Sequence, residues 1–278
     1  MKTPPPGGEA GASYRAWEGI WTSKLEELDK RGARGRPVTG LGRWMAGHGD
    51  LQRLVVQELR RAGLADGSRA RVLEVGCGSG DILGLLDRRG IEAVGCDICV
   101  SAARVCRRLG RTAAAADASW LPFRDGEFDV SYASGVLDQM EDPDIRGVVL
   151  EMRRVTRPGG IMLVVSTSRR CRLHEWTRKR LERLGRWPYG RKRALGSLLP
   201  LLESCLRDCR LEERERGLLI QLHFIGYLFA RRPALVRLLH GLSLVMNWSL
   251  WPLNRLPGTV LVDTAVLPRS PEPDRPQS

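Results

Sequence analysis

Short apolar runs alternate with amphipathic stretches between residues 71 and 165, and this alternation predicts an α/β fold. Arg71–Val75 and Ile91–Cys96 have the pattern of buried strands, and the leucines and isoleucine of residues 82–86 form a helical stripe between them. A helix with a proline in its first turn is expected from Asp142. Further strands are expected at Thr112–Ala116, Glu127–Ala133 and Ile161–Val165. Strands that alternate with helices in this way predict a mostly parallel sheet with helices on both faces.

The first predicted strand ends in a glycine-rich turn. Gly76, Gly78 and Gly80 stand at alternate positions, and an acid, Glu74, precedes the first of them. Glycine tolerates positive φ and lets the backbone approach a ligand closely. A dinucleotide-binding turn has the spacing Gly-x-Gly-x-x-Gly, whereas Asp81 occupies the last of those positions here. The spacing therefore favours a different nucleotide-containing ligand.

Three more stretches accompany this turn: Asp117–Phe123 (Asp-Ala-Ser-Trp-Leu-Pro-Phe), Phe128–Val130 (Phe-Asp-Val) and Arg154–Gly160 (Arg-Val-Thr-Arg-Pro-Gly-Gly). Together with Glu-x-Gly-x-Gly-x-Gly they resemble the class I S-adenosylmethionine (SAM) methyltransferases, in their quinone-biosynthesis-like branch (methyltransferase type 11). The resemblance covers about residues 50–167 and, weakly, the final strand Thr259–Leu267. It implies a Rossmann-like, seven-stranded, mostly parallel sheet with helices on both faces and helical insertions before and after the sixth strand.

The resemblance also implies which residues bind SAM. The three glycines would approach the methionine part, and Glu74 would hold the loop or the SAM amino group. Asp97, which closes the second strand about 20 residues after the turn, would bind the ribose hydroxyls. The full set is Glu74, Gly76, Gly78, Gly80, Asp97, Ile98, Asp117, Ala118 and Ser134. The alternatives are that the glycines form only a tight connection, that Asp97 is a solvated strand end and that Asp117 only forms a turn.

The catalytic residue is not assigned by the sequence. Where relatives often have histidine in a Leu-His-His-type stretch, this chain has Val136–Met140. Asp138 could deprotonate a hydroxyl, although an acid at a helix start is more often a cap. His48 is a more remote candidate base, with a plain loop residue as the alternative. No metal is expected, because Cys96 and Cys99 have Cys-x-x-Cys spacing without a second pair.

Composition and pattern divide the 278 residues into segments. The seven cysteines have irregular spacing and the N-terminus lacks an apolar leader, so a cytoplasmic protein is expected, with membrane association left open. The expected segments are a disordered tail at 1–12, an N-terminal helical cap at 13–49, a SAM-binding core at 50–167, a basic insertion at 168–193, a C-terminal part of the fold at 194–267 with an apolar helical insertion at 217–256, and a disordered tail at 268–278.

The net charge of +13 is concentrated in one place: residues 169–193 contain 11 lysines and arginines against two acids. Leu173, Trp176, Leu181 and Leu184 are expected to share one face of a basic helix. A solvated basic face and an anionic membrane surface are both open, whereas nucleic acid is disfavoured because aromatic residues are not interleaved with the basic ones. The apolar segment 217–256 predicts interfacial contact or a soluble lid, and spanning is disfavoured because the last strand must rejoin the sheet.

The sequence therefore predicts a SAM-dependent methyltransferase that transfers a methyl group to a small or lipid-like acceptor by in-line displacement. The alternatives are a non-catalytic SAM-fold binding or scaffolding protein, and an RNA methyltransferase that uses the basic segment. The position that is methylated and the oligomeric state stay open.

Overall fold

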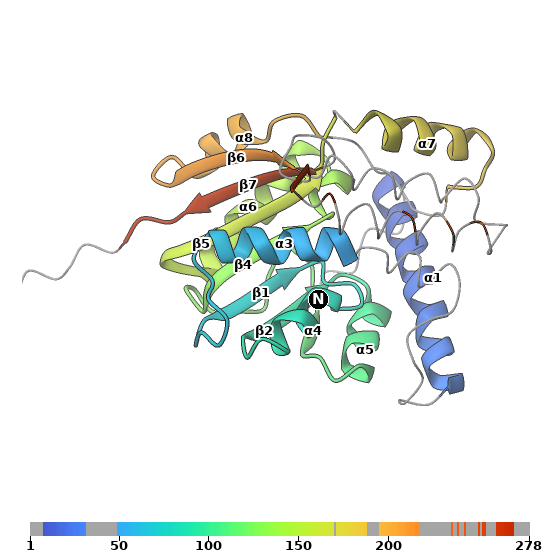
Figure 1. Ribbon diagram of the computed structural model, residues 1–278, viewed down its shortest axis with the longest axis horizontal. Helices are drawn as coiled ribbons and strands as arrows, with labels where there is room; N and C mark the ends of the chain where they lie inside the picture. Colours follow the sequence, from blue (N-terminus) through green and yellow to red (C-terminus); the bar gives the residue numbers. More distant parts are fainter. Residues whose placement is uncertain are drawn as a thin grey trace, which may run out of the picture.

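A seven-stranded sheet forms the centre of the molecule (Figure 1). The computed structural model describes residues 8–31, 49–169, 171–187, 195–216 and 260–269, and the single residues 235, 238, 242, 250, 252 and 253. The strand order is β3-β2-β1-β4-β5-β7-β6, and β7 alone among them runs antiparallel to its neighbours. The strands are β1 Arg71–Val75, β2 Glu92–Asp97, β3 Ala113–Ala115, β4 Phe128–Ser134, β5 Thr156–Thr167, β6 Arg210–Arg216 and β7 Val260–Val266. The expected mostly parallel α/β sheet is confirmed.

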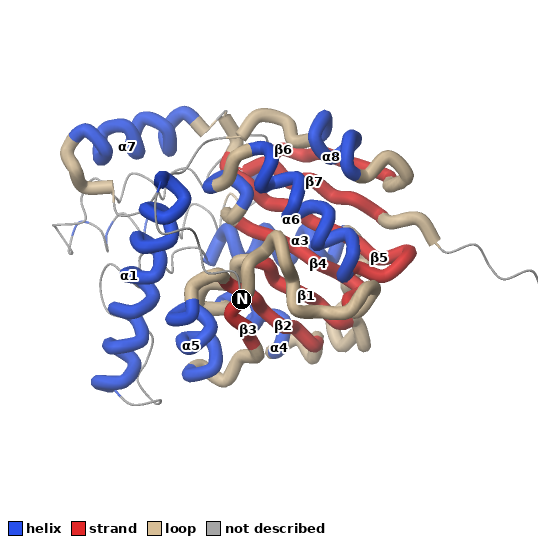
Figure 2. Tube along the Cα trace, turned by 180° about the vertical axis from the view of Figure 1, so that it is seen from behind, coloured by secondary structure: helices blue, strands red, loops and turns tan. Residues whose placement is uncertain are grey.

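Helices cover both faces of the sheet. Helices α3 (Gly49–Arg61) and α4 (Asp81–Asp87) pack on one face, and α6 (Asp142–Val155) and α8 (Leu199–Cys205) pack on the other (Figure 2). Neighbouring residues of a strand point to opposite faces, so β5 contributes Val164 to one apolar core and Val165 to the other. Strands that are buried on both faces explain the continuous apolar runs in the sequence.

Two further helices lie beyond the carboxyl ends of the parallel strands (Figure 1). These are α1 (Gly8–Arg31), which packs against α5 (Val100–Arg108), and α7 (Arg172–Arg183), which follows β5. Helix α1 begins at Gly8, inside the segment 1–12 that was expected to be a disordered tail. The helix therefore extends further toward the N-terminus than the prolines and glycines of that segment suggest.

Local differences from the expected boundaries occur at β5 and α6. Strand β5 begins at Thr156, so Arg157–Gly160 extends the strand instead of only breaking the preceding helix. Gly159 has φ 72°. The pairing of β4 with β5 shifts register between Phe128 and Val130, and this irregularity in the strand accommodates Gly159 and Gly160. Glu141, not Asp142, holds the N-cap position of α6, and its side chain makes no capping hydrogen bond.

Strand β6 was not placed by the sequence. Its residues are Arg-Leu-Glu-Glu-Arg-Glu-Arg, and it forms an edge of the sheet, where charged side chains reach solvent. The helical insertion expected before it is present as α7 and α8. Most of the insertion expected after it, 217–256, lies outside the described residues. Among the described residues, no helix is both long enough and apolar enough to cross a bilayer.

A buried acid that faces another acid lies near this edge of the sheet. Asp263 on β7 is 1% exposed and is paired in register with Glu213 on β6. Its carboxyl interacts with the carboxyl of Glu213, which faces it across the two strands. Burial and the nearby charge of Glu213 raise the pKa of Asp263 to about 8. The folded protein therefore holds this carboxyl in its neutral form near neutral pH.

We expect Asp263→Asn to stabilise the fold at pH 9 and to have much less effect at pH 5. Because the folded-state pKa lies above the ordinary 3.8, the protonated carboxyl contributes fully below about pH 4, and that contribution is lost as the pH rises through about 8. The amide is neutral and can donate to Glu213, so the free energy of unfolding at pH 9 should rise by about 1–3 kcal/mol. Urea denaturation at both pH values measures this, with exposed Glu203→Gln as the control. An equal effect at both pH values would refute it.

Candidate functional site

The glycine-rich turn after β1 has the backbone conformation that only glycine adopts readily. Gly76, Gly78 and Gly80 have φ of 71°, 51° and 65°. The turn is fixed to β2, because the backbone N–H groups of Gly76 and Cys77 donate to the carbonyl oxygen of Cys96 at 2.8 and 2.9 Å. A Cβ on Gly76 would overlap Val136. The three glycines are therefore required by the local structure and form a cradle of closely packed backbone, in which Gly76 is half-buried and Gly78 and Gly80 are buried.

Asp97 at the end of β2 holds this loop. Its Oδ2 accepts the backbone N–H of Gly78 at 2.9 Å, and its Oδ1 accepts that of Cys99 at 2.9 Å. The side chain is buried, so the alternative of a solvated strand end is wrong, and burial raises its pKa. Two of the roughly four lone-pair positions of a carboxylate are used in this way, which leaves acceptors for ligand hydroxyls. Ile98 follows directly and is 40% exposed, as a residue that contacts a flat ring would be.

Glu74 lies under the loop on β1. It is 4% exposed and paired in register with Tyr132 on β4. Burial raises the pKa of Glu74 well above its usual range, and the Tyr132 hydroxyl offsets part of that effect. Its Oε2 has no hydrogen-bond partner among the described residues. A buried carboxyl oxygen without a partner beside a glycine cradle fits a site that accepts a hydrogen bond from a bound cofactor.

The remaining predicted cofactor residues lie at the same edge of the sheet. Asp117 and Ala118 follow β3, and Ser134 is the last residue of β4. Asp117 Oδ1 accepts hydrogen bonds from Ser119 N and Ser119 Oγ, both at 2.8 Å, so it forms a turn whether or not it also contacts a ligand. The structure thus brings all the predicted cofactor residues to the carboxyl ends of β1–β4, where open α/β sheets bind ligands.

Arg111 is a part of the site that sequence reasoning missed. Its Nη1 donates to Asp81 Oδ1 at 3.0 Å and to the carbonyl oxygen of Ser79, and so holds the far end of the glycine loop. A Cβ on Gly84 would lie 2.9 Å from Arg111 Nε, which explains a glycine inside α4. Burial alone would raise the pKa of Asp81, but the charges of Lys24 and Arg111 outweigh it and the pKa is lowered. The only indication of this contact in the sequence is the presence of an arginine just before β3.

Helix α1 covers the cradle. The position of a Cβ on Gly78 is 2.7 Å from Cζ2 of Trp21, and the Trp17 ring stacks on Trp21 with centroids 6.1 Å apart. Trp17 Nε1 donates to the side-chain oxygen of Gln139, whose amide donates to the carbonyl of Gly135 at 2.7 Å. The predicted N-terminal cap is therefore attached to the loop after β4 and lies directly over the glycine loop.

The candidate catalytic residues are not supported equally. Asp138, in the 3₁₀ turn Leu137–Gln139, is 0% exposed, and its Oδ2 accepts a hydrogen bond from Thr167 Oγ1 at 2.8 Å. This enclosure and the hydrogen bond to Thr167 favour a structural role for Asp138, and its role as a base stays a prediction. His48 lies outside the described residues.

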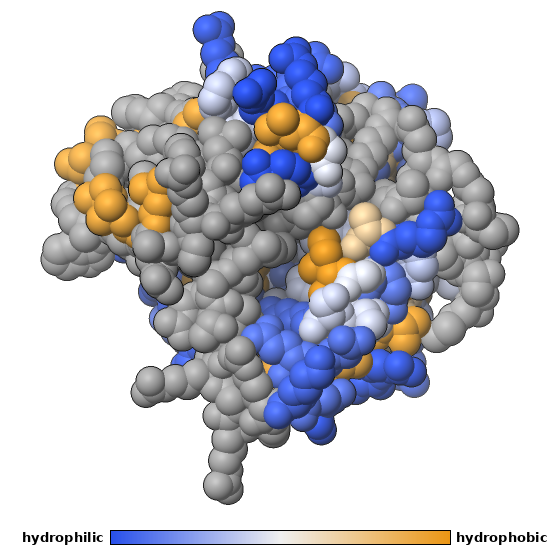
Figure 3. Space-filling model, turned by 90° about the vertical axis from the view of Figure 1, so that its right-hand side faces the viewer, coloured by the Kyte–Doolittle hydropathy of each residue, from blue (hydrophilic) through white to orange (hydrophobic). Residues whose placement is uncertain are grey.

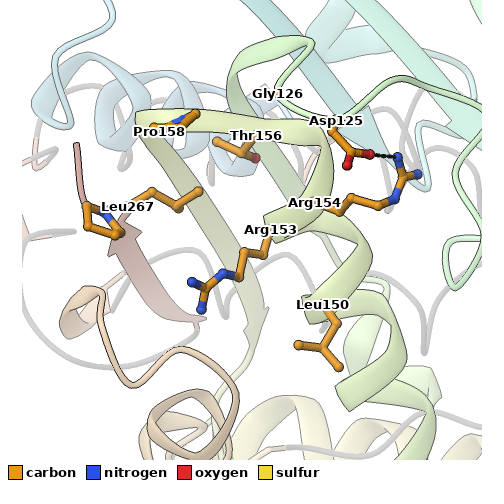
Figure 4. Close-up of a pocket in the computed structure, with 9 residues that line it drawn as sticks. Asp125, Gly126, Leu150, Arg153, Arg154, Thr156, Pro158 and Leu267 are labelled. Atoms are coloured by element: carbon orange, nitrogen blue, oxygen red, sulfur yellow. Dashed lines mark hydrogen bonds and ion pairs between the residues drawn. The ribbon is translucent and has the colours of Figure 1, made fainter. Parts of the chain in front are cut away.

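A cavity of about 490 Å³ lies at the opposite edge of the sheet (Figure 4). It is lined by Thr156 at the start of β5 and by Leu267 just past the end of antiparallel β7, so it faces the amino ends of the parallel strands. Its arginines are paired with acids: Arg154 Nη1 lies 2.7 Å from Asp125 Oδ1, and Arg153 Nη2 lies 2.5 Å from Asp208 Oδ2. This cavity is separate from the glycine loop, and the chemistry of the site lies at the carboxyl edge.

Comparison with known proteins agrees with this geometry. Residues 73–164 match a family described as a methyltransferase domain. A tRNA (carboxymethyluridine(34)-5-O)-methyltransferase of Arabidopsis thaliana is 33% identical over 34% of this chain and 23% of that protein. A demethylmenaquinone methyltransferase of Beutenbergia cavernae is 40% identical over 35% of this chain and 41% of that protein. The chain spans less than half the length of these curated relatives.

Solved structures share the fold over most of the chain. A SAM-dependent methyltransferase from Thermotoga maritima superposes with a TM-score of 0.57 at 15% identity and covers 91% of this chain and 99% of that one. The [4+2]-cyclase SpnF has a TM-score of 0.55 at 19% identity and covers 97% of this chain and 100% of that one. The match of residues 73–164 confirms the resemblance to the methyltransferase domain, the solved structures share its fold, and this likeness implies SAM as the cofactor.

Proposed function

We propose that the protein is a SAM-dependent methyltransferase whose acceptor is a small or lipid-like molecule. The observation that carries this proposal is the cradle of Gly76, Gly78 and Gly80, with positive φ at all three positions, between the buried carboxyls of Glu74 and Asp97. Such a cradle suits a ligand that has an amino group and a ribose. The matched methyltransferase domain supports the same cofactor.

The cofactor, when bound, supplies a methyl group that its sulfonium has already activated. The chain must then align the acceptor with that methyl group and keep water out. In this proposal Asp97 accepts ribose hydroxyls through its unused lone pairs, and Arg111 keeps the loop in position. The indole rings of Trp17 and Trp21 cover the loop and exclude water from it. None of these tasks requires a base, which is consistent with the burial of Asp138.

The comparisons and the exposed leucines leave three candidate functions. The quinone named for the relative from Beutenbergia cavernae supports an apolar acceptor, and exposed leucines at residues 238 and 242 support contact with apolar material. The relative from Arabidopsis thaliana, named for tRNA, keeps RNA as the second candidate. The third candidate is a SAM-fold protein without methyl transfer, because a structure with this fold is named as a cyclase.

Transfer of a labelled methyl group distinguishes these three functions. Purified protein is incubated with SAM labelled in its methyl group and with either membrane lipid extract, total tRNA or buffer. We expect label in the organic phase of the lipid reaction, and much less label with the Asp97→Ala variant at the same SAM concentration. Label in tRNA alone would establish the RNA alternative. Binding of SAM without label in either acceptor would favour the non-catalytic alternative.

A further inference from the structure

Helix α7 presents a basic face outward. Its buried positions are Cys171 at the N-cap, His174, Thr177 and Leu181. The predicted apolar face is different, because two of its members, Trp176 and Leu184, lie on the outside. Trp176 is 57% exposed and Leu184 is 48% exposed. Residues three to four positions apart share one side of a helix. The outer side of α7 therefore carries Arg172, Trp176, Lys179, Arg180 and Arg183.

The charges of this outer face are available to a partner. Arg178 lies at the side of the helix, where it pairs with Glu175 at 3.0 Å and with Glu182 at 2.5 Å. Lys179 has a weaker contact with Glu175 at 3.8 Å. In the described part of the chain, no ion pair involves Arg172, Arg180 or Arg183, the remaining three basic residues of α7.

Exposed apolar residues accompany the basic helix. Within the apolar segment 217–256, the described residues Leu238, Leu242, Leu250 and Leu253 have exposed fractions of 60%, 53%, 43% and 38%. Leu238 and Leu242 each have helical backbone conformation. Figure 3 shows the end of the molecule beyond the carboxyl edge of the sheet. Both apolar and strongly hydrophilic residues are exposed on this face. Exposed leucines and an exposed basic helix face together suit a partner that offers both an apolar region and negative charge.

We infer that the outer face of α7 and these exposed leucines form a docking surface for an anionic lipid bilayer. This inference rests on the proposed function, because it brings the edge that carries the cofactor site to the surface where a lipid-like acceptor is found. Arginines bind anionic headgroups, Trp176 has the amphipathic ring that favours a membrane interface, and the leucines insert among the acyl chains. The electrostatic part is screened by salt and the apolar part is not.

The composition of the face favours a bilayer over RNA. A groove for single-stranded RNA stacks bases on successive aromatic rings, and Trp176 is the only aromatic residue between Arg172 and Arg183. Four exposed leucines would have no role against a phosphate backbone, whereas a bilayer offers headgroups and an apolar interior together. RNA binding is therefore the competing outcome of the test.

Vesicle flotation tests the docking surface. Wild-type protein is mixed at low salt with vesicles of phosphatidylcholine and phosphatidylglycerol, or of phosphatidylcholine alone. We expect flotation with the anionic vesicles and not with the neutral ones. Replacement of Arg172, Arg180 and Arg183 by Gln should lower the partition coefficient by about 100-fold, because each basic residue near an anionic surface contributes about fivefold.

A matched variant removes the same charge from the opposite edge. Arg88, Arg124 and Arg207 are exposed in the connections that precede β2, β4 and β6, and their replacement by Gln should leave flotation within about twofold. Absence of wild-type flotation, or equal loss in both triple variants, would overturn the docking surface, as would tighter binding of an RNA oligonucleotide through the α7 arginines. Calorimetry with SAM on the same proteins separates the two proposals, since flotation without SAM binding would contradict only the proposed function.

Discussion

Replacement of Gly78 by valine will abolish SAM binding while the sheet stays folded. The backbone of Gly78 has φ 51°, and its Cβ position is 2.7 Å from Cζ2 of Trp21 and 3.0 Å from Cη2. A branched side chain therefore strains the loop and pushes α1 away from the surface that the cofactor must approach. The strain of positive φ costs about 1–3 kcal/mol, and the occupied cradle should lower SAM affinity by at least about 100-fold, as measured by calorimetry.

Gly110→Val is the matched control for this variant. Gly110 has φ 74°, and no atom lies within 4 Å of its Cβ position, so the same strain arises there without a collision. Both variants should lose stability in thermal unfolding, Gly78→Val somewhat more because of its collision with Trp21, and only Gly78→Val should lose SAM. Equal loss of SAM affinity in both, or normal affinity in Gly78→Val, would show that Gly78 has a structural role alone.

Replacement of Asp97 by alanine will weaken SAM binding by about 10- to 150-fold. A hydrogen bond to a charged group contributes about 1.5–3 kcal/mol, and Asp97 is the buried acid beside the cradle at the end of β2. The variant also leaves the N–H groups of Gly78 and Cys99 without their acceptor, so some loss of stability is expected as well. Calorimetry measures the first effect and thermal unfolding the second.

A ligand lacking one hydroxyl separates contact with the ribose from positioning of the loop. S-adenosylhomocysteine and its 2′-deoxy analogue are titrated into wild type and Asp97→Ala. If Asp97 binds the ribose, the missing hydroxyl should weaken binding to the wild type and have little effect in the variant. The same loss in both proteins would mean that Asp97 acts only through Gly78 and Cys99.

The parts of the site that depend on local sequence were predictable. Residues 71–75 are a short apolar run followed directly by alternate glycines, and both the strand and the conformation of the turn follow from that stretch alone. Asp97 was also predictable, because the acid that ends the second strand lies at a nearly fixed separation from the turn. The seven-stranded, mostly parallel sheet follows from the family resemblance, whereas the strand order was not predicted.

The parts that depend on contacts distant in sequence were not predictable. Arg111 follows α5 in the sequence and reaches Ser79 in the loop from 32 residues away, and nothing in its own neighbourhood distinguishes it from other surface arginines. Strand β6 has no apolar alternation, since it obtains its pairing from β7 at an edge of the sheet. The outward side of α7 was assigned wrongly because the buried side contains His174 and Thr177, which hydropathy alone would place in solvent.

The most direct test of the central claim is a calorimetric titration of the wild-type protein with SAM and, separately, with NAD. The glycine spacing, the buried Glu74 and the anchored Asp97 predict one SAM bound per chain and no measurable heat with NAD. Binding of NAD, or the absence of SAM binding by the folded protein, would contradict the assignment of the glycine loop as a SAM site.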